Sequence, residues 1–83
     1  MEIVFRTTRR GAIEMQQELA LIGFVAFVSK EPKDFIVTIE LDTDAVRHYS
    51  KLEDTLARHA RWGHIISPIQ ILEQGKELTW KAI

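Results

Sequence analysis

The sequence contains no cysteine, which excludes disulfide bonds and thiolate-based metal or redox centres. Such a chain relies on its core alone for stability, and its composition fits a reducing compartment. It also lacks a long apolar run: the longest, residues 22–28, is far shorter than the roughly 20 residues that cross a bilayer. The N-terminus, MEIVFRTTRR, has no signal-peptide pattern of positive charge followed by an apolar stretch. We predict a cytoplasmic protein without membrane contact.

An excess of charge of one sign is missing as well, since the formal net charge is −1. The chain therefore has no overall basic field to attract nucleic acid. Apolar residues make up 46% of the sequence and charged residues 28%, which is ordinary for a globular protein and excludes a disordered one. With 83 residues the chain has room for a single domain, 1–83. A domain of this size has a narrow stability margin, to which association with another chain could add.

The clearest pattern present is a β-hairpin over residues 24–41. Residues 35–41 alternate, with one side wholly apolar and the other mixed, which is typical of a half-buried strand. Residues 24–28 are β-branched and aromatic without polar alternation, which suits a strand covered on both faces or meeting a partner. Residues 31–34, Glu-Pro-Lys-Asp, supply a polar turn.

The N-terminal part predicts a strand followed by a helix. Residues 2–6 alternate as a first strand, and residues 7–11 are expected to form a loop. From Ala12 onward, apolar residues recur at helical spacing, and Gly23 is a natural terminator. We therefore predict a first helix from Ala12 to about Gly23.

A second helix and a final hairpin complete the pattern. Residues 42–44 offer N-cap oxygens for a helix that ends at Gly63, although a capping box allows a later start near Tyr49. Strand patterns at 69–71 and 78–83 flank a turn. The order predicts an α+β, ferredoxin-like split β-α-β-β-α-β fold with an extra C-terminal strand, its two helices on one face of an antiparallel sheet. The first strand should pair with the third, and the last should lie beside the fourth.

The helix-free face of this sheet is a candidate partner-binding surface. Its expected composition is more apolar than that of a solvated face, and contiguous apolar patches usually mark an interface. Trp80, in the C-terminal strand, could reach a partner or pack on the domain. The residues predicted on this face are Val4, Ala26, Val28, Ile36, Thr38 and Glu40.

A second candidate is the segment before the first helix, which could bind a small anion or metabolite. Cations and hydroxyls at a helix N-terminus suit a phosphate or carboxylate. The alternative is a solvated loop whose arginines pair with surface acids, and no Gly-rich phosphate fingerprint is present. The candidate residues are Arg6, Thr7, Thr8, Arg9, Arg10 and Gly11.

A third candidate is a basic stripe on the outer face of the second helix, which could follow a phosphate backbone or dock on an acidic protein. Asp54 interrupts it and forms a favourable i,i+4 pair with Arg58, so an ordinary solvated face explains the pattern too. The candidate residues are Arg47, Lys51, Arg58 and Arg61.

The sequence shows no sign of catalysis, metal or cofactor. His48, His59 and His64 lack the His-x-x-x-His spacing that binds zinc from one helix face, and His59 and His64 are explained by the dipole at the end of the second helix. No acid, base and nucleophile are grouped, so we predict no enzyme. Phe5 and Phe35 are expected in the core, which disfavours an RNA-recognition module.

These patterns favour a small binding protein, such as a regulator, adaptor or inhibitor, that contacts another protein and could form a homodimer; such compact chains are also typical of phage and mobile-element inhibitors. The alternatives are the anion or metabolite sensor and the nucleic-acid-binding domain.

Overall fold

The computed structural model describes residues 1–41, 49–73 and 76–79 of the chain. These residues form an α+β domain, as predicted, including an extra strand at the C-terminal end, which begins at Lys76 and not at Leu78 as expected. In chain order the elements are β1 (Glu2–Thr7), α1 (Arg9–Leu21), β2 (Val25–Lys30), β3 (Phe35–Glu40), α2 (Tyr49–Arg61), β4 (Gln70–Glu73) and β5 (Lys76–Thr79).

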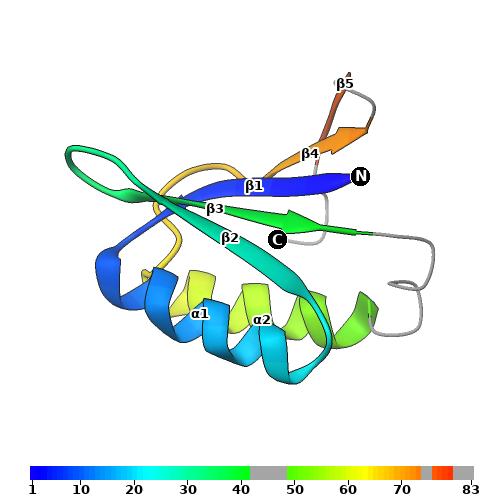
Figure 1. Ribbon diagram of the computed structural model, residues 1–83, viewed down its shortest axis with the longest axis horizontal. Coiled ribbons are helices and arrows are strands. Elements are labelled where there is room, and N and C mark those ends of the chain that lie inside the picture. The colour runs from blue at the N-terminus through cyan, green and yellow to red at the C-terminus, as the bar shows by residue number, and fades with distance from the viewer. Residues whose placement is uncertain (42–48, 74–75, 80–83) are drawn as a thin grey trace.

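The strands form one antiparallel sheet in the order β2-β3-β1-β4-β5. Strand β3 lies between β1 and β2, and β1 lies between β3 and β4, so each β-α-β unit is split by a strand of the other. Both helices cover the same face of the sheet (Figure 1). The predicted pairings of the first strand with the third, and of the last with the fourth, are confirmed.

The core lies between this face and the two helices. Alternate residues of the central strands point into it, as the period-two pattern predicted, and the apolar stripes of α1 and α2 close it from the other side. Burial of these side chains supplies the main driving force for folding. The central members are Ile3, Phe5, Val37 and Ile39 from the sheet and Met15, Leu19, Leu52 and Leu56 from the helices.

The hairpin of β2 and β3 forms as predicted, with Lys30 paired to Phe35 next to the turn. The Glu31 backbone N–H donates to the Asp34 carbonyl oxygen over 2.9 Å. Outside the turn, Arg6 of β1 donates to the Asp34 carboxylate over 2.8 Å. The turn is therefore fixed both by its own backbone and by the central strand.

The first helix starts earlier than predicted, because α1 begins at Arg9 and not at Ala12. Thr8 has an extended backbone, and its hydroxyl oxygen accepts a hydrogen bond from the Gly11 N–H over 3.1 Å, which makes Thr8 the N-cap. The predicted loop at 7–11 is wrong: Thr7 ends β1, and residues 9–11 form the first turn of α1. The terminator at Gly23 is confirmed by its positive φ of 91°.

The phase of β2 is opposite to the prediction. Ala26 pairs with Ile39 and Val28 pairs with Val37, and both β3 partners are fully buried. Opposite residues of an antiparallel pair share a face, so Ala26 and Val28 face the helices and pack against the core. Their predicted place on the open face is wrong. The run 24–28 contains no polar residue, and only the pairing with β3 decides which side of it is buried.

The second helix ends as predicted, and Gly63 adopts a positive φ of 76°. The predicted N-cap at residues 42–44 lies outside the described residues. No helix among the described residues has both the length and the apolar character required to cross a membrane.

Candidate functional sites

The helix-free side of the sheet carries a row of side chains across three strands. Val4 of β1 pairs with Thr38 of β3, which pairs with Phe27 of β2. Phe27 is 54% exposed and its neighbour on the same face, Val25, is 56% exposed. We call this surface the open sheet face and define it by Val4, Val25, Phe27, Ile36 and Thr38. Of the predicted members, Val4, Ile36, Thr38 and Glu40 lie on this side of the sheet, Glu40 opposite Val25, whereas Trp80 lies outside the described residues.

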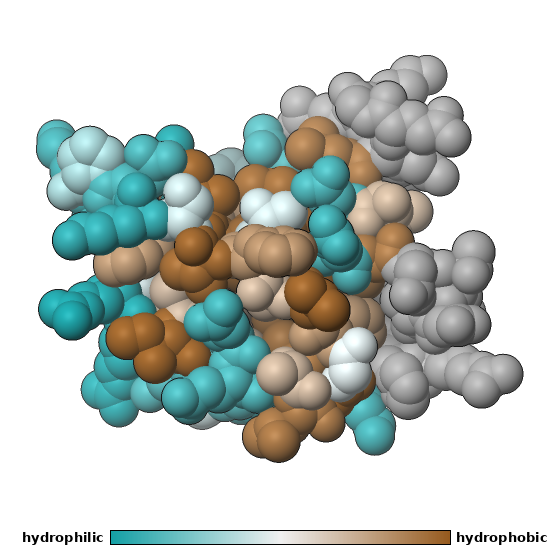
Figure 2. Space-filling view, viewed as in Figure 1, coloured by the Kyte–Doolittle hydropathy of each residue, from teal (hydrophilic) through white to brown (hydrophobic). Residues whose placement is uncertain are grey.

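The most exposed apolar side chains of this face belong to a strand at the end of the sheet. Strand β2 pairs with β3 on one side, and β5 extends the opposite edge of the sheet beyond β4. Figure 2 shows apolar side chains across the middle of the visible face, where β2 runs across the front in Figure 1, with polar side chains on either side. An edge strand with large apolar side chains can accept a further strand.

The predicted anion-binding residues are mostly engaged with other parts of the protein. The Arg6 guanidinium pairs with Asp34 over 2.8 Å, and the Arg10 guanidinium pairs with Glu14 over 3.0 Å. Thr7 is fully buried, and its hydroxyl has no hydrogen-bond partner among the described residues.

The other members of this segment serve the start of the helix. The Thr8 hydroxyl occupies the Gly11 N–H, one of the donors that an anion would use, while Arg9 is exposed. In the structure this segment therefore acts as a helix cap flanked by ion pairs.

The predicted basic stripe on α2 is split. Lys51 and Arg61 are exposed, and Arg47 lies outside the described residues. Arg58 is partly engaged: its Nη2 donates to Glu18 Oε2 of α1 over 2.6 Å, and its guanidinium carbon lies 5.6 Å from the centre of the Trp62 ring. Its side chain is nevertheless 40% exposed, so the predicted stripe contains one cation that is paired with the other helix.

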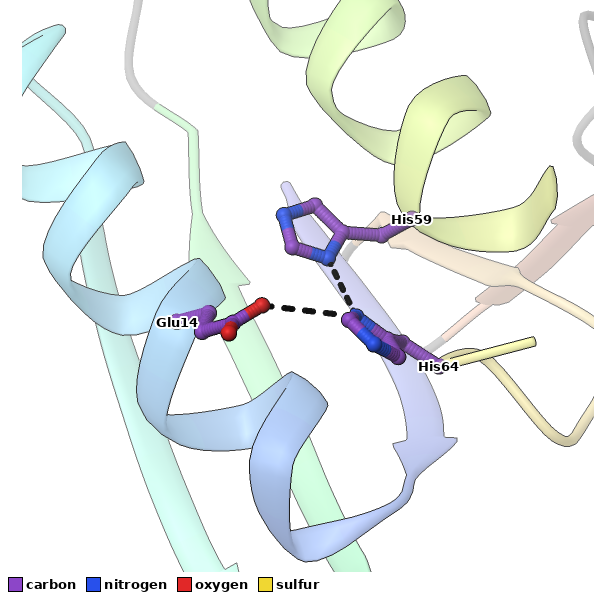
Figure 3. Close-up of side chains that lie close together, drawn as sticks. All are labelled: Glu14, His59 and His64. Atoms are coloured by element: carbon purple, nitrogen blue, oxygen red, sulfur yellow. Dashed lines mark hydrogen bonds and ion pairs between the residues drawn. The ribbon is translucent and has the colours of Figure 1, made fainter. Parts of the chain in front are cut away.

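Where α1 meets the end of α2, the structure assembles a cluster that the sequence did not predict (Figure 3). His59 is fully buried, and its Nδ1 lies 2.8 Å from His64 Nδ1. His59 Nε2 lies 2.9 Å from Glu18 Oε2, and His64 Nδ1 lies 3.7 Å from Glu14 Oε2. The packing of the two helices therefore places two carboxylates of α1 beside two imidazoles: His59 lies in the last turn of α2, and His64 lies just after the helix.

Hydrogen bonding fixes where the ring hydrogens lie. Because a carboxylate only accepts, His59 Nε2 carries a hydrogen and donates it to Glu18. The two Nδ1 atoms share one hydrogen, since two hydrogens between atoms 2.8 Å apart would face each other. The cluster is thus a row of polar contacts that runs from Glu18 through His59 and His64 to Glu14.

Arg58 adds a second positively charged partner beside Glu18. Partial burial raises the pKa of Glu18, but hydrogen bonds from His59 and Arg58, together with their charges, outweigh it, so the pKa lies below its usual value. Glu18 is therefore held as a carboxylate that orients His59.

The position of His64 depends on a close approach between backbones. A Cβ added to Gly11 would lie 2.6 Å from the His64 Cβ, so only glycine fits at this point of α1. The Thr8 N–H donates to the His64 carbonyl oxygen over 2.9 Å, and the His64 N–H donates to the His59 carbonyl oxygen over 3.0 Å. The segment that carries His64 is therefore fixed to both helices.

Beside the cluster lies an open pocket of about 610 Å³. It runs along the solvent side of α1 and reaches the exposed edges of Glu14 and His64, so the cluster can be approached from water. Its lining residues are Arg10, Glu14, Gln17, Glu18, Trp62 and His64.

Two signals in the sequence could have revealed the cluster. Leu52, Leu56 and His59 follow helical spacing, which places His59 on the buried stripe of α2. Glu14 and Glu18 are four residues apart and share one side of α1. The spacing of histidines within one helix says nothing about residues that two helices bring together, so it gave no sign of this cluster.

No protein-family model matches the chain, and comparison with curated proteins and with solved structures finds no similar protein. Functional inference therefore rests on the geometry of this structure.

Proposed function

We propose that the protein is a small binding domain that acts through its open sheet face and the β2 edge, with a second copy of the chain as the first partner. The observation that carries this proposal is the exposure of Val25 and Phe27 on an edge strand, at 56% and 54%. Pairing of two β2 edges would continue the sheet from one copy into the other and place Val25 and Phe27 beside side chains of the second copy.

The sequence of β2 is compatible with pairing to itself. In an antiparallel pair related by a two-fold axis through Phe27, the two Phe27 side chains lie opposite each other, and Val25 lies opposite Ser29. The only charged residue of the strand, Lys30, then faces Phe24 and not another lysine. Like charges directly opposite would destabilise such a pair, and aromatic pairs stabilise it.

The two alternative functions have weaker support from the contacts. An anion sensor and a nucleic-acid binder both need several available cationic groups. Arg6, Arg10 and Arg58 pair with carboxylates, which leaves Arg9 in the first candidate site and Lys51 and Arg61 in the second as exposed cations.

The test is the molar mass in solution, measured by sedimentation equilibrium over a range of concentrations. We expect the wild-type chain to reach the mass of two chains and Phe27→Lys to remain a monomer. Leu21→Lys is the matched control, because Leu21 is 87% exposed but lies on the side of α1 that faces α2, away from the β2 edge; this variant should dimerise like the wild type.

A strict monomer at the highest concentration would refute the homodimer. So would unchanged dimerisation of Phe27→Lys, because a lysine at the centre of the paired strands places two like charges opposite each other.

A further inference from the structure

The geometry points to a binding site for a divalent transition-metal ion, Zn²⁺ in the first place, formed by Glu14 Oε2, His59 Nδ1 and His64 Nδ1. The inference does not depend on the proposed contact surface, because the cluster joins α1 to the end of α2, on the opposite side of the sheet.

The three ligand atoms are spaced as such an ion requires. One ligand atom from each of the three residues lies within 4.8 Å of those of the other two. Two atoms bound to Zn²⁺ at about 2.05 Å with a tetrahedral angle lie about 3.3 Å apart. The observed separations of 2.8 Å between the imidazole nitrogens and 3.7 Å between His64 Nδ1 and Glu14 Oε2 lie on either side of this value. Shifts of about half an ångström at these two contacts would admit the ion, which would take the place of the hydrogen shared by the two rings.

The outer contacts are those of a built metal site. A metal-binding histidine usually donates its other ring N–H to a carboxylate, which fixes the ring and increases its basicity. His59 makes this contact with Glu18 over 2.9 Å. Glu14 uses only Oε1 to accept from Arg10, over 3.0 Å, so its Oε2 is the oxygen turned toward His64. Two of the three ligands are therefore oriented by neighbours that do not themselves occupy the metal position.

Burial and access also fit a metal site. His59 is fully buried, so its position is set by packing and not by solvent. The side chain of His64 is 14% exposed and that of Glu14 is 34% exposed, and both border the open pocket. The pocket provides an access route for the ion and room for water as a further ligand.

The ligand set selects the class of metal. Two imidazole nitrogens and one carboxylate oxygen suit Zn²⁺ and related transition ions, whereas Mg²⁺ and Ca²⁺ prefer oxygen ligands alone.

The test is titration of the EDTA-stripped, dialysed full chain with Zn²⁺, followed by calorimetry. We expect one ion per chain, at least ten-fold weaker binding in Glu14→Gln and in His64→Gln, and no comparable uptake of Mg²⁺. Asp54→Asn is the matched control: it removes the same charge from an exposed position on α2 and should bind like the wild type.

Imidazole ¹⁵N spectra of the wild type give a readout that needs no variant. Zn²⁺ should shift the Nδ1 resonances of both His59 and His64. Absence of Zn²⁺ binding by the wild type, unchanged affinity in both ligand variants, or unshifted Nδ1 resonances would each overturn the proposal. The same titration on monomeric Phe27→Lys should give wild-type affinity, which separates this test from that of the dimer.

Discussion

Gly11→Ala should destabilise the protein, which is the reverse of the usual effect of this substitution in a helix. In a helix interior, alanine is favoured over glycine by roughly 1 kcal/mol. At this position the new Cβ would lie 2.6 Å from the His64 Cβ and 3.2 Å from the His64 carbonyl oxygen. Neither contact can be relieved by rotating a side chain, because both atoms move only with the backbone.

The backbone around His64 has little freedom to move away. Its carbonyl oxygen accepts from the Thr8 N–H over 2.9 Å, and two residues later the Ile66 N–H donates to the Arg6 carbonyl oxygen over 2.9 Å. Overpacking at well-packed positions costs about 1–3 kcal/mol. After subtraction of the helix-propensity gain, we expect a net loss of up to about 2 kcal/mol. For a domain of this size each kcal/mol lowers the melting temperature by roughly 4–8 °C.

Urea unfolding followed by circular dichroism measures this loss. Gln17→Ala, on the exposed side of α1, is the control and should change the free energy of unfolding by less than about 0.5 kcal/mol. A gain in stability of roughly 1 kcal/mol in Gly11→Ala, the usual effect in a helix, would refute the close approach of α1 to His64. In that case the geometry of the histidine cluster would be wrong as well.

Three further predictions concern stability. With EDTA present, the free energy of unfolding should fall as the pH drops below 4.5, the usual pKa of a glutamate such as Glu18. The reason is that a pKa lowered in the folded state stabilises the protein above that pH, and this contribution is lost when Glu18 is protonated. Glu18→Gln should flatten the dependence of stability on pH, as measured by urea titrations. Leu56→Ala should cost about 2–5 kcal/mol in urea unfolding, whereas Leu21→Ala, at a position 87% exposed, should cost less than about 0.5 kcal/mol; equal losses would contradict the assigned core. Thr8→Ala should cost about 1 kcal/mol and Thr8→Ser much less, since serine keeps the oxygen that caps α1; identical thermal unfolding curves for the two would exclude the cap.

Local patterns in the sequence predicted the elements and their order. Alternation in residues 35–41 identified a half-buried strand, and glycines 23 and 63 marked the two helix ends. These signals are local, because strand alternation, helical spacing and positive-φ termini each depend on a few neighbouring residues. The split topology followed from that order, since right-handed crossovers leave few ways to arrange it.

Tertiary contacts decided what the local pattern left open. The apolar run 24–28 is compatible with either phase, and pairing with β3 turned Phe27 outward and Val28 inward. This choice changed the membership of the open sheet face, on which the proposed partner contact depends.

The histidine cluster is likewise a product of the tertiary structure. Glu14 and Glu18 lie at least 41 positions before His59 and His64, which is about half of the chain, and a sequence shows no distance between such residues. They meet because the apolar stripes of α1 and α2 pack on the same sheet face and because Gly11 lets the chain after α2 approach the start of α1. The elements and the class of fold follow from local periodicity and turn chemistry, which can be seen in short stretches of the sequence. The sheet register and the helix packing, which depend on contacts between distant residues, decided the exposed strand face and the candidate metal ligands.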